Sequence, residues 1–186
     1  MNMRLFDATV DLRILSYFIC NSSKEEHVNG IARAMRISSS SASISCRKLQ
    51  KEGLLIKQVR GNACFYSLNN ANPLVRSLKR AWFLETLLRY KQAWENDEFL
   101  SVALYGSYSS GEFIEKSDVD ILVITNIPEK DVSSKFSHLK ESMRAEVLLT
   151  VFSLARWGEM AKKRDRFYEE VAANHLILYG SPIVMG

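Results

Sequence analysis

The feature that most constrains the fold is a pair of apolar runs with a fixed spacing between their polar ends. The first run, FLSVALY, covers residues 99–105 and leads into Gly106 and Ser107. Ten residues later, DVDILVI begins with Asp118 and Asp120. Both runs have the β-rich apolar composition of buried strands. The sequence therefore predicts two strands joined through a Gly-Ser turn and a short helix.

This spacing favours the chemistry of a metal and a phosphate. Side chains alternate along a strand, so Asp118 and Asp120 share a face and can hold one hard cation. The Gly-Ser turn brings free backbone N–H groups to a phosphate, and the Ser107 hydroxyl adds one hydrogen bond. Magnesium-dependent nucleotidyl transfer needs both features. The expected cofactors are Mg²⁺ and a nucleoside triphosphate, with ATP as the expected nucleotide.

The motif resembles the signature of the polymerase-β-like minimal nucleotidyltransferases. Besides the Gly-Ser turn and the Asp-x-Asp pair, Glu112 falls where that family commonly has Glu. The resemblance covers residues 96 to about 180. It implies a mixed α/β core, magnesium, and transfer of a nucleoside monophosphate from a triphosphate to an acceptor. The nucleotide contacts that it implies are Gly106, Ser107, Gly111 and Ser117.

The chain departs from that family at two places. The family often carries arginine at the positions of Tyr108 and Ser110, where it can contact the triphosphate. Active members also carry a third acid on a neighbouring strand, here AEVLLTVF, and by alignment this acid falls on Leu148. Glu146 lies two residues earlier, roughly 6.6 Å along the strand. Asp118, Asp120 and Glu146 are the candidate catalytic residues, with Asp118 and Asp120 as metal ligands; whether Glu146 replaces the third acid stays open.

The first half of the chain is basic. Residues 1–95 contain 15 Lys and Arg against 7 Asp and Glu, whereas the remainder is acidic. Three helical patterns, within residues 7–20, 28–37 and 38–53, precede two β-rich runs that flank Arg60-Gly61-Asn62, a hairpin signal. This order resembles the winged helix-turn-helix of many transcription regulators over about the first 70 residues.

The expected DNA contacts lie on the third helix and on the wing. Short donors and cations on one helical face suit the major groove, and wing cations suit phosphates. The alternative is a winged helix used for protein contact alone. The predicted DNA-binding residues are Ser39, Ser40, Ser43, Arg47, Lys51, Lys57 and Arg60.

Pro73 opens a long apolar pattern that continues to about residue 96. Leu74, Leu78, Ala81, Leu84 and Leu88 follow one helical stripe, and further aromatic residues widen it. The expected organisation is a DNA-binding domain at 1–70, a linker helix at 71–96 and a nucleotidyltransferase-like domain at 97–186, in the α+β class. A helix with this much apolar surface predicts a homodimer.

Two functions remain open from the sequence. In the first, the chain is a DNA-binding transcriptional regulator whose second domain binds nucleotide and Mg²⁺. In the second, it is an active nucleotidyltransferase, similar to antitoxins that modify a partner toxin, acting on a protein or nucleic acid. Three widely spaced cysteines, and no apolar run near the roughly 20 residues of a membrane span, indicate a cytoplasmic protein without a membrane partner.

Overall fold

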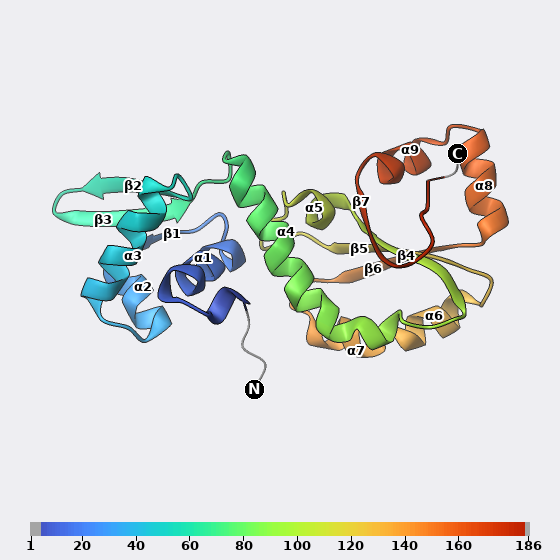
Figure 1. Ribbon diagram of the computed structural model, residues 1–186, viewed down its shortest axis with the longest axis horizontal. Coiled ribbons are helices and arrows are strands. Elements are labelled where there is room, and N and C mark those ends of the chain that lie inside the picture. The colour runs from blue at the N-terminus through green and yellow to red at the C-terminus, as the bar shows by residue number, and fades with distance from the viewer. Residues whose placement is uncertain (1–4, 185–186) are drawn as a thin grey trace. The chain divides into compact units, whose positions relative to one another are not determined.

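The protein, seen as a computed structural model, is described over residues 5–184, and its chain divides into two compact units, residues 1–85 and 86–186. Within the described residues the first unit contains a three-stranded sheet and the second a four-stranded sheet (Figure 1). Helices accompany both sheets, as expected for the α+β class. Every helix within residues 5–184 is too short or too polar to cross a lipid bilayer.

The first unit contains the three expected helices and the expected hairpin. The β2–β3 pairing closes at Arg60 and Ala63 around the two-residue turn at Gly61 and Asn62, and β1 pairs with the other edge of β3. The elements are η1 (Leu5–Asp7), α1 (Val10–Cys20), β1 (Glu25–His27), α2 (Val28–Met35), α3 (Ser39–Lys51), β2 (Leu55–Arg60), β3 (Ala63–Leu68) and most of α4 (Pro73–Leu87).

Local chemistry explains where the helices α1 and α3 begin. The Thr9 hydroxyl accepts a hydrogen bond from the Leu12 N–H, and the Ser38 hydroxyl accepts one from the Ser41 N–H. Each bond satisfies a donor that the first helical turn would otherwise leave without a partner. On the inner face of α3, Ala42, Cys46 and Leu49 are buried, as the periodicity predicts.

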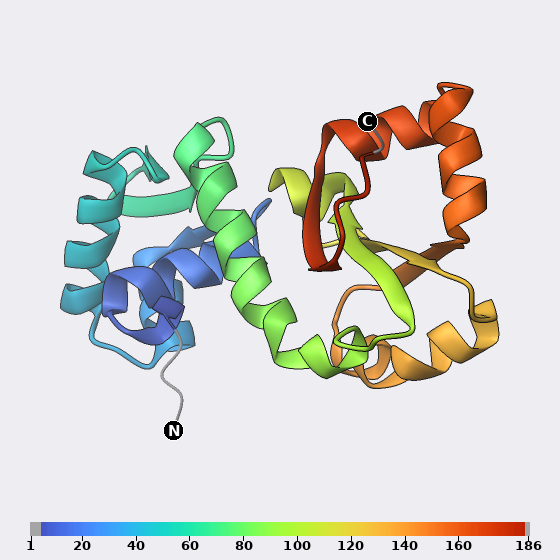
Figure 2. The ribbon, with the colours of Figure 1, turned by 45° about the vertical axis from the view of Figure 1, so that its right-hand side comes forward.

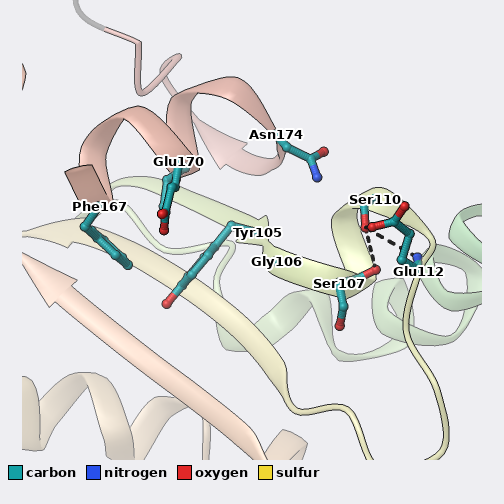
Figure 3. Close-up of a pocket in the computed structure, with 9 residues that line it drawn as sticks. Tyr105, Gly106, Ser107, Ser110, Glu112, Phe167, Glu170 and Asn174 are labelled. Carbon is teal, nitrogen blue, oxygen red and sulfur yellow. Dashed lines mark hydrogen bonds between the residues drawn. The ribbon is translucent and has the colours of Figure 1, made fainter. Parts of the chain in front are cut away.

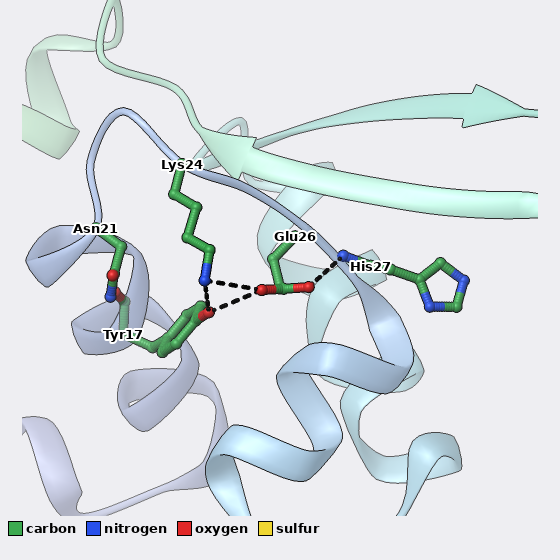
Figure 4. A network of polar contacts seen from close by, with 5 residues as sticks. All are labelled: Tyr17, Asn21, Lys24, Glu26 and His27. Carbon is green, nitrogen blue, oxygen red and sulfur yellow. Dashed lines mark hydrogen bonds and ion pairs between the residues drawn. The ribbon is translucent and has the colours of Figure 1, made fainter.

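A polar network ties β1 to α1 in the first unit (Figure 4). Glu26 accepts hydrogen bonds from the Tyr17 hydroxyl and from its neighbour His27 N–H, and forms an ion pair with Lys24 at 3.0 Å. Lys24 lowers the pKa of the Glu26 carboxyl. The Glu26 carboxylate also lies directly over Gly30, where a Cβ would collide with it. The network therefore fixes the short strand against both helices that flank it.

Helix α4 differs from the expected linker helix in length and in its buried face. It ends at Leu87 and is followed by the 3-10 helix η2 (Leu88–Ala93), in which Tyr90 has non-helical dihedrals. The buried residues are Val75, Lys79, Phe83 and Leu87, whereas Leu74 and Leu88 of the predicted stripe are exposed. The buried Lys79 interrupts the apolar pattern, so the sequence indicated the wrong stripe. Of the apolar surface on which the homodimer prediction rests, Phe83 and Leu87 are buried and Leu74 and Leu88 are exposed, so the homodimer stays a prediction.

The second unit is a mixed sheet in the order β6-β5-β4-β7. Strands β4 and β5 are antiparallel, β4 and β7 are antiparallel, and β5 and β6 are parallel. The strands predicted at residues 99–105, 118–124 and 145–152 are confirmed, with β5 beginning at Val119 and β6 at Val147. The elements are β4 (Phe99–Tyr105), α5 (Gly106–Ser110), β5 (Val119–Thr125), α6 (Glu129–Lys135), α7 (Ser137–Ser142), β6 (Val147–Phe152), α8 (Leu154–Lys162), α9 (Arg166–Ala173) and β7 (His175–Gly180).

Helices cover both faces of this sheet (Figure 2). On one face Leu122 and Ile124 of β5 pack with Trp157 of α8 and Val171 of α9. After residue 153 the chain forms two helices, α8 and α9, because Arg164 adopts a left-handed φ of 50° and the Asp165 side chain then caps α9. This break turns α9 back across the sheet face that also carries Asp120.

Candidate nucleotide site

The Gly-Ser turn is fixed by its own hydrogen bonds and needs glycine. Gly106 has a φ of +70°, and a Cβ there would collide with the Asp120 carboxylate. The Ser109 hydroxyl donates to the Gly106 carbonyl at 2.9 Å, and the Glu112 N–H donates to the Ser107 carbonyl at 2.9 Å. Among the described residues, the Ser107 hydroxyl has no hydrogen-bond partner, so it is available to a ligand.

The two aspartates follow the turn on the neighbouring strand. Asp120 pairs with Tyr105 across β4 and β5, and Asp118 is exposed immediately before β5. Burial raises the pKa of the Asp120 carboxyl, and the negative charge of Asp118 raises this pKa further. The two carboxylates are therefore close enough to repel each other. A divalent cation would relieve this repulsion, and Mg²⁺ is commonly held by one or two carboxylates together with substrate phosphates.

Strand β6 supplies no carboxylate beside Asp120. The parallel register places Leu148 directly opposite Asp120, and the Leu148 side chain is 41% exposed. The Val119 N–H donates to the Glu146 carbonyl at 2.8 Å, so Glu146 lies immediately before β6 and level with Asp118. Within residues 5–184 no group of three His, Cys, Asp or Glu side chains could hold a metal ion. Glu146 therefore does not form a three-ligand metal cluster with Asp118 and Asp120.

A pocket of about 360 Å³ adjoins the turn (Figure 3). Its first wall comes from the motif and contains Tyr105, Gly106, Ser107, Ser110 and Glu112. Its second wall is one face of α9, with Phe167, Glu170, Val171 and Asn174. The motif gave no indication of the second wall, although the spacing i, i+3, i+4, i+7 of these residues is that of a single helical face.

Four positions of the motif have roles that their sequence spacing did not reveal. Tyr108 is buried and stacks on Phe113 with ring centroids 4.2 Å apart, so it packs in the core, whereas Ser110 lines the pocket. Gly111 ends α5 with a φ of +77°. The Ser117 hydroxyl accepts a hydrogen bond from the Ile114 N–H and shapes the turn before Asp118. Gly111 and Ser117 therefore form the loop and lie outside the pocket lining.

The predicted DNA-binding residues differ in solvent exposure and in the contacts that they already make within the first unit. Ser39, Ser40, Arg47 and Lys51 are exposed on α3, and Ser43 is partly exposed beside them. The Arg47 guanidinium donates to the Ser43 carbonyl at 3.3 Å, within the same helix.

On the wing, Lys57 is exposed. Arg60, by contrast, forms an ion pair with Glu25 at 2.7 Å and lies over the Phe65 ring. A carboxylate of the unit itself therefore already offsets the Arg60 charge.

The fold and the motif define the class of domain. A mixed sheet that carries a Gly-Ser turn on one strand and an Asp-x-Asp pair on the next is the arrangement of a nucleotidyltransferase. Residues 85–178 match the nucleotidyltransferase domain family, and the chain belongs to that family.

Other comparisons add little. No curated protein sequence matches the chain. Among solved structures, a chain from the complex of tri-AMPylated Shewanella oneidensis HEPN toxin with MNT antitoxin is 18% identical. The match covers 57% of this chain and 73% of that chain, with a TM-score of 0.32. A likeness of this strength carries no functional conclusion.

Proposed function

We propose that the second unit binds a nucleoside triphosphate through Mg²⁺ and transfers its nucleoside monophosphate to an acceptor hydroxyl. The observation that carries the proposal is the position of the Asp120 carboxylate, which lies over Gly106 and beside the charge of Asp118. Family membership supports the same reaction. Asp118 and Asp120 are the proposed metal ligands, with Gly106 and Ser107 under the phosphates.

The bound metal would neutralise charge on the phosphates and orient them for in-line attack. In the reaction the acceptor oxygen forms a bond to the α-phosphorus, and the bond from that phosphorus to the bridging oxygen breaks, releasing pyrophosphate. The acceptor hydroxyl must lose its proton. We assign that proton to Glu146, the carboxylate at the start of β6, because Leu148 can neither accept a proton nor bind metal.

The proposed acceptor is a hydroxyl of a partner protein such as a toxin, or of a nucleic acid. This choice rests on the resemblance of the motif to antitoxin-type minimal nucleotidyltransferases. ATP is the proposed nucleotide.

Calorimetry of the full chain with ATP and Mg²⁺ tests binding. Incubation with nucleotides labelled at the α-phosphate tests transfer to a co-purified partner, to RNA or to the chain itself. Heats that are the same with and without Mg²⁺ would overturn the proposal.

We further propose that the first unit is a winged helix-turn-helix that binds duplex DNA and gives the chain a regulatory role. The specific observation is the exposed face of α3, which carries Ser40, Arg47 and Lys51, next to the β2–β3 hairpin. Serine hydroxyls and arginine suit base edges in the major groove.

The DNA proposal predicts binding that weakens steeply as salt rises, because each neutralised phosphate releases counterions. Arg47→Ala should cost roughly 1–3 kcal/mol of binding free energy if Arg47 contacts a base. Arg33→Ala, an exposed arginine of α2, is the charge-matched control. An anisotropy titration without binding at low salt would end this second proposal.

A further inference from the structure

We propose that the pocket between α5 and α9 binds the nucleoside part of the triphosphate, with Glu170 holding the sugar hydroxyls, so that the unit selects ribonucleotides. This inference rests on the proposed nucleotide binding at Asp118 and Asp120. It assigns a substrate class to that site from residues outside the motif.

The pocket is placed next to where the phosphates would lie. It shares Gly106 and Ser107 with the proposed phosphate turn, and Tyr105 in its wall pairs in register with Asp120. Because directly paired residues point to the same side of a sheet, the pocket and the Asp120 carboxylate share one face. A ligand with its phosphates over Ser107 therefore extends its remaining atoms into this pocket.

The chemistry of the α9 wall suits a nucleoside and disfavours a phosphate. Among the described residues, the lining contains no lysine or arginine, and Glu112 and Glu170 contribute two carboxylates. A phosphate would be repelled from the Glu170 end of the pocket, away from Gly106 and Ser107, whereas neutral hydroxyls can donate to the Glu170 carboxylate. The Tyr105 and Phe167 rings, packed edge to face with centroids 5.6 Å apart, add an apolar surface for a base.

The direction of α9 gives the order of contacts along the ligand. Its C-terminal end is tied to α5, since the Ser109 hydroxyl donates to the Asn174 carbonyl at 3.1 Å. At 1.5 Å rise per residue, Glu170 lies about 6 Å and Phe167 about 10 Å further along the helix than Asn174. A nucleotide presents phosphate, sugar and base in that order. Asn174 is thus placed near the phosphates, Glu170 near the sugar and Phe167 near the base.

The Glu170 carboxylate is oriented for such a contact. Its side chain points from α9 toward Tyr105, into the pocket (Figure 3). One carboxylate oxygen, Oε1, accepts a hydrogen bond from the Arg166 guanidinium at 2.8 Å. This leaves Oε2 to accept from a ribose hydroxyl, as a carboxylate does in dinucleotide-binding domains.

The test is calorimetry of the full chain with ATP and with 2′-deoxy-ATP, each with saturating Mg²⁺. The wild type should bind ATP about tenfold more tightly, which is what a hydrogen bond to a charged group contributes. Glu170→Ala should bring the two affinities within about twofold of each other, chiefly by weakening ATP. Phe167→Leu should weaken both nucleotides and keep their ratio, because base stacking does not involve the 2′ hydroxyl.

Glu169→Ala is the matched control, an exposed glutamate of the same helix that lies outside the pocket lining. It should keep the wild-type preference. Equal affinities of the wild type for the two nucleotides, or an unchanged ratio in Glu170→Ala, would overturn this inference alone if binding still required Asp118 and Asp120. Absence of all Mg²⁺-dependent binding would overturn the proposed function together with it.

Discussion

Strands β5 and β6 lie side by side and run in the same direction, yet they present different chemistry at the same level. β5 carries Asp120, half-buried, with Asp118 just before it. β6 carries Leu148 in direct register with Asp120, and Glu146 lies two residues before Leu148, just ahead of the strand. Asp118 and Asp120 are the proposed cation ligands, whereas Leu148, opposite Asp120, can neither bind metal nor move a proton. In the proposed function, nucleotide binding therefore depends on Asp118 and Asp120, and turnover depends on Glu146 of the neighbouring segment.

The largest effect is expected on β5. Replacing both Asp118 and Asp120 by Asn should reduce Mg²⁺-dependent ATP affinity at least about 100-fold and remove detectable transfer, because the neutral amides no longer attract the cation. Calorimetry with and without Mg²⁺ measures the loss. Asp131→Asn, an exposed acid in the first turn of α6, should leave affinity unchanged. Equal heats from the double variant and the wild type would refute the site.

The second largest effect is expected on the rate of nucleotide transfer, from substitutions at Glu146 and Leu148. Glu146→Gln should lower the rate of nucleotide transfer by roughly 10²–10⁴, the usual contribution of a general base, while ATP affinity stays the same. Adding Leu148→Asp to this variant should restore transfer, since it places a carboxylate in register with Asp120. Single-turnover assays separate binding from chemistry. A Glu146→Gln variant with full activity would remove Glu146 from the mechanism.

A smaller effect should follow from the turn that faces β5. Gly106→Ala forces a side chain into a positive φ, which costs about 1–2 kcal/mol, and pushes the Asp120 carboxylate away. We expect a lower free energy of unfolding and roughly tenfold weaker ATP binding. Gly158→Ala, within α8 where a Cβ meets nothing within 4 Å, is the control and should retain both properties. Full affinity in Gly106→Ala would contradict the close approach of turn and carboxylate.

The smallest effect concerns the charge on Asp120 without metal. Because the pKa of Asp120 is raised in the folded state, its contribution to stability is present at acid pH and is lost as pH rises above the usual range of Asp. Asp120→Asn should therefore melt at a higher temperature than the wild type at pH 7. The difference should shrink toward pH 3.5.

Comparing the melting temperatures of Asp120→Asn and the wild type at each pH separates the effect of Asp120 from that of other carboxylates. Asp11 and Glu26 have lowered pKa values, caused by Lys48 and Lys24, and give the opposite pH slope in both proteins. Saturating Mg²⁺ should stabilise the wild type and not the variant. A difference in melting temperature that does not change with pH would mean that the Asp120 charge is not the cause.

The sequence alone determined the strands and the chemistry of the motif. Apolar runs fixed β4, β5 and β6, since side-chain alternation and strand length are properties of the local backbone. The Gly-Ser turn and Asp118-x-Asp120 indicated the candidate site, and alignment of the third strand already placed Leu148 where an acid is expected. The parallel register confirms that leucine lies opposite Asp120.

The tertiary structure decided what distant segments bring to the site and which faces are buried. Glu170 and Asn174 reach the pocket because β7 pairs with β4 and turns α9 onto the sheet face of Asp120, more than fifty residues from the motif. The buried face of α4 includes Lys79, which no apolar pattern predicts. Arg60 is paired with Glu25 across the sheet. Such contacts depend on strand order and packing, which a local sequence pattern does not encode.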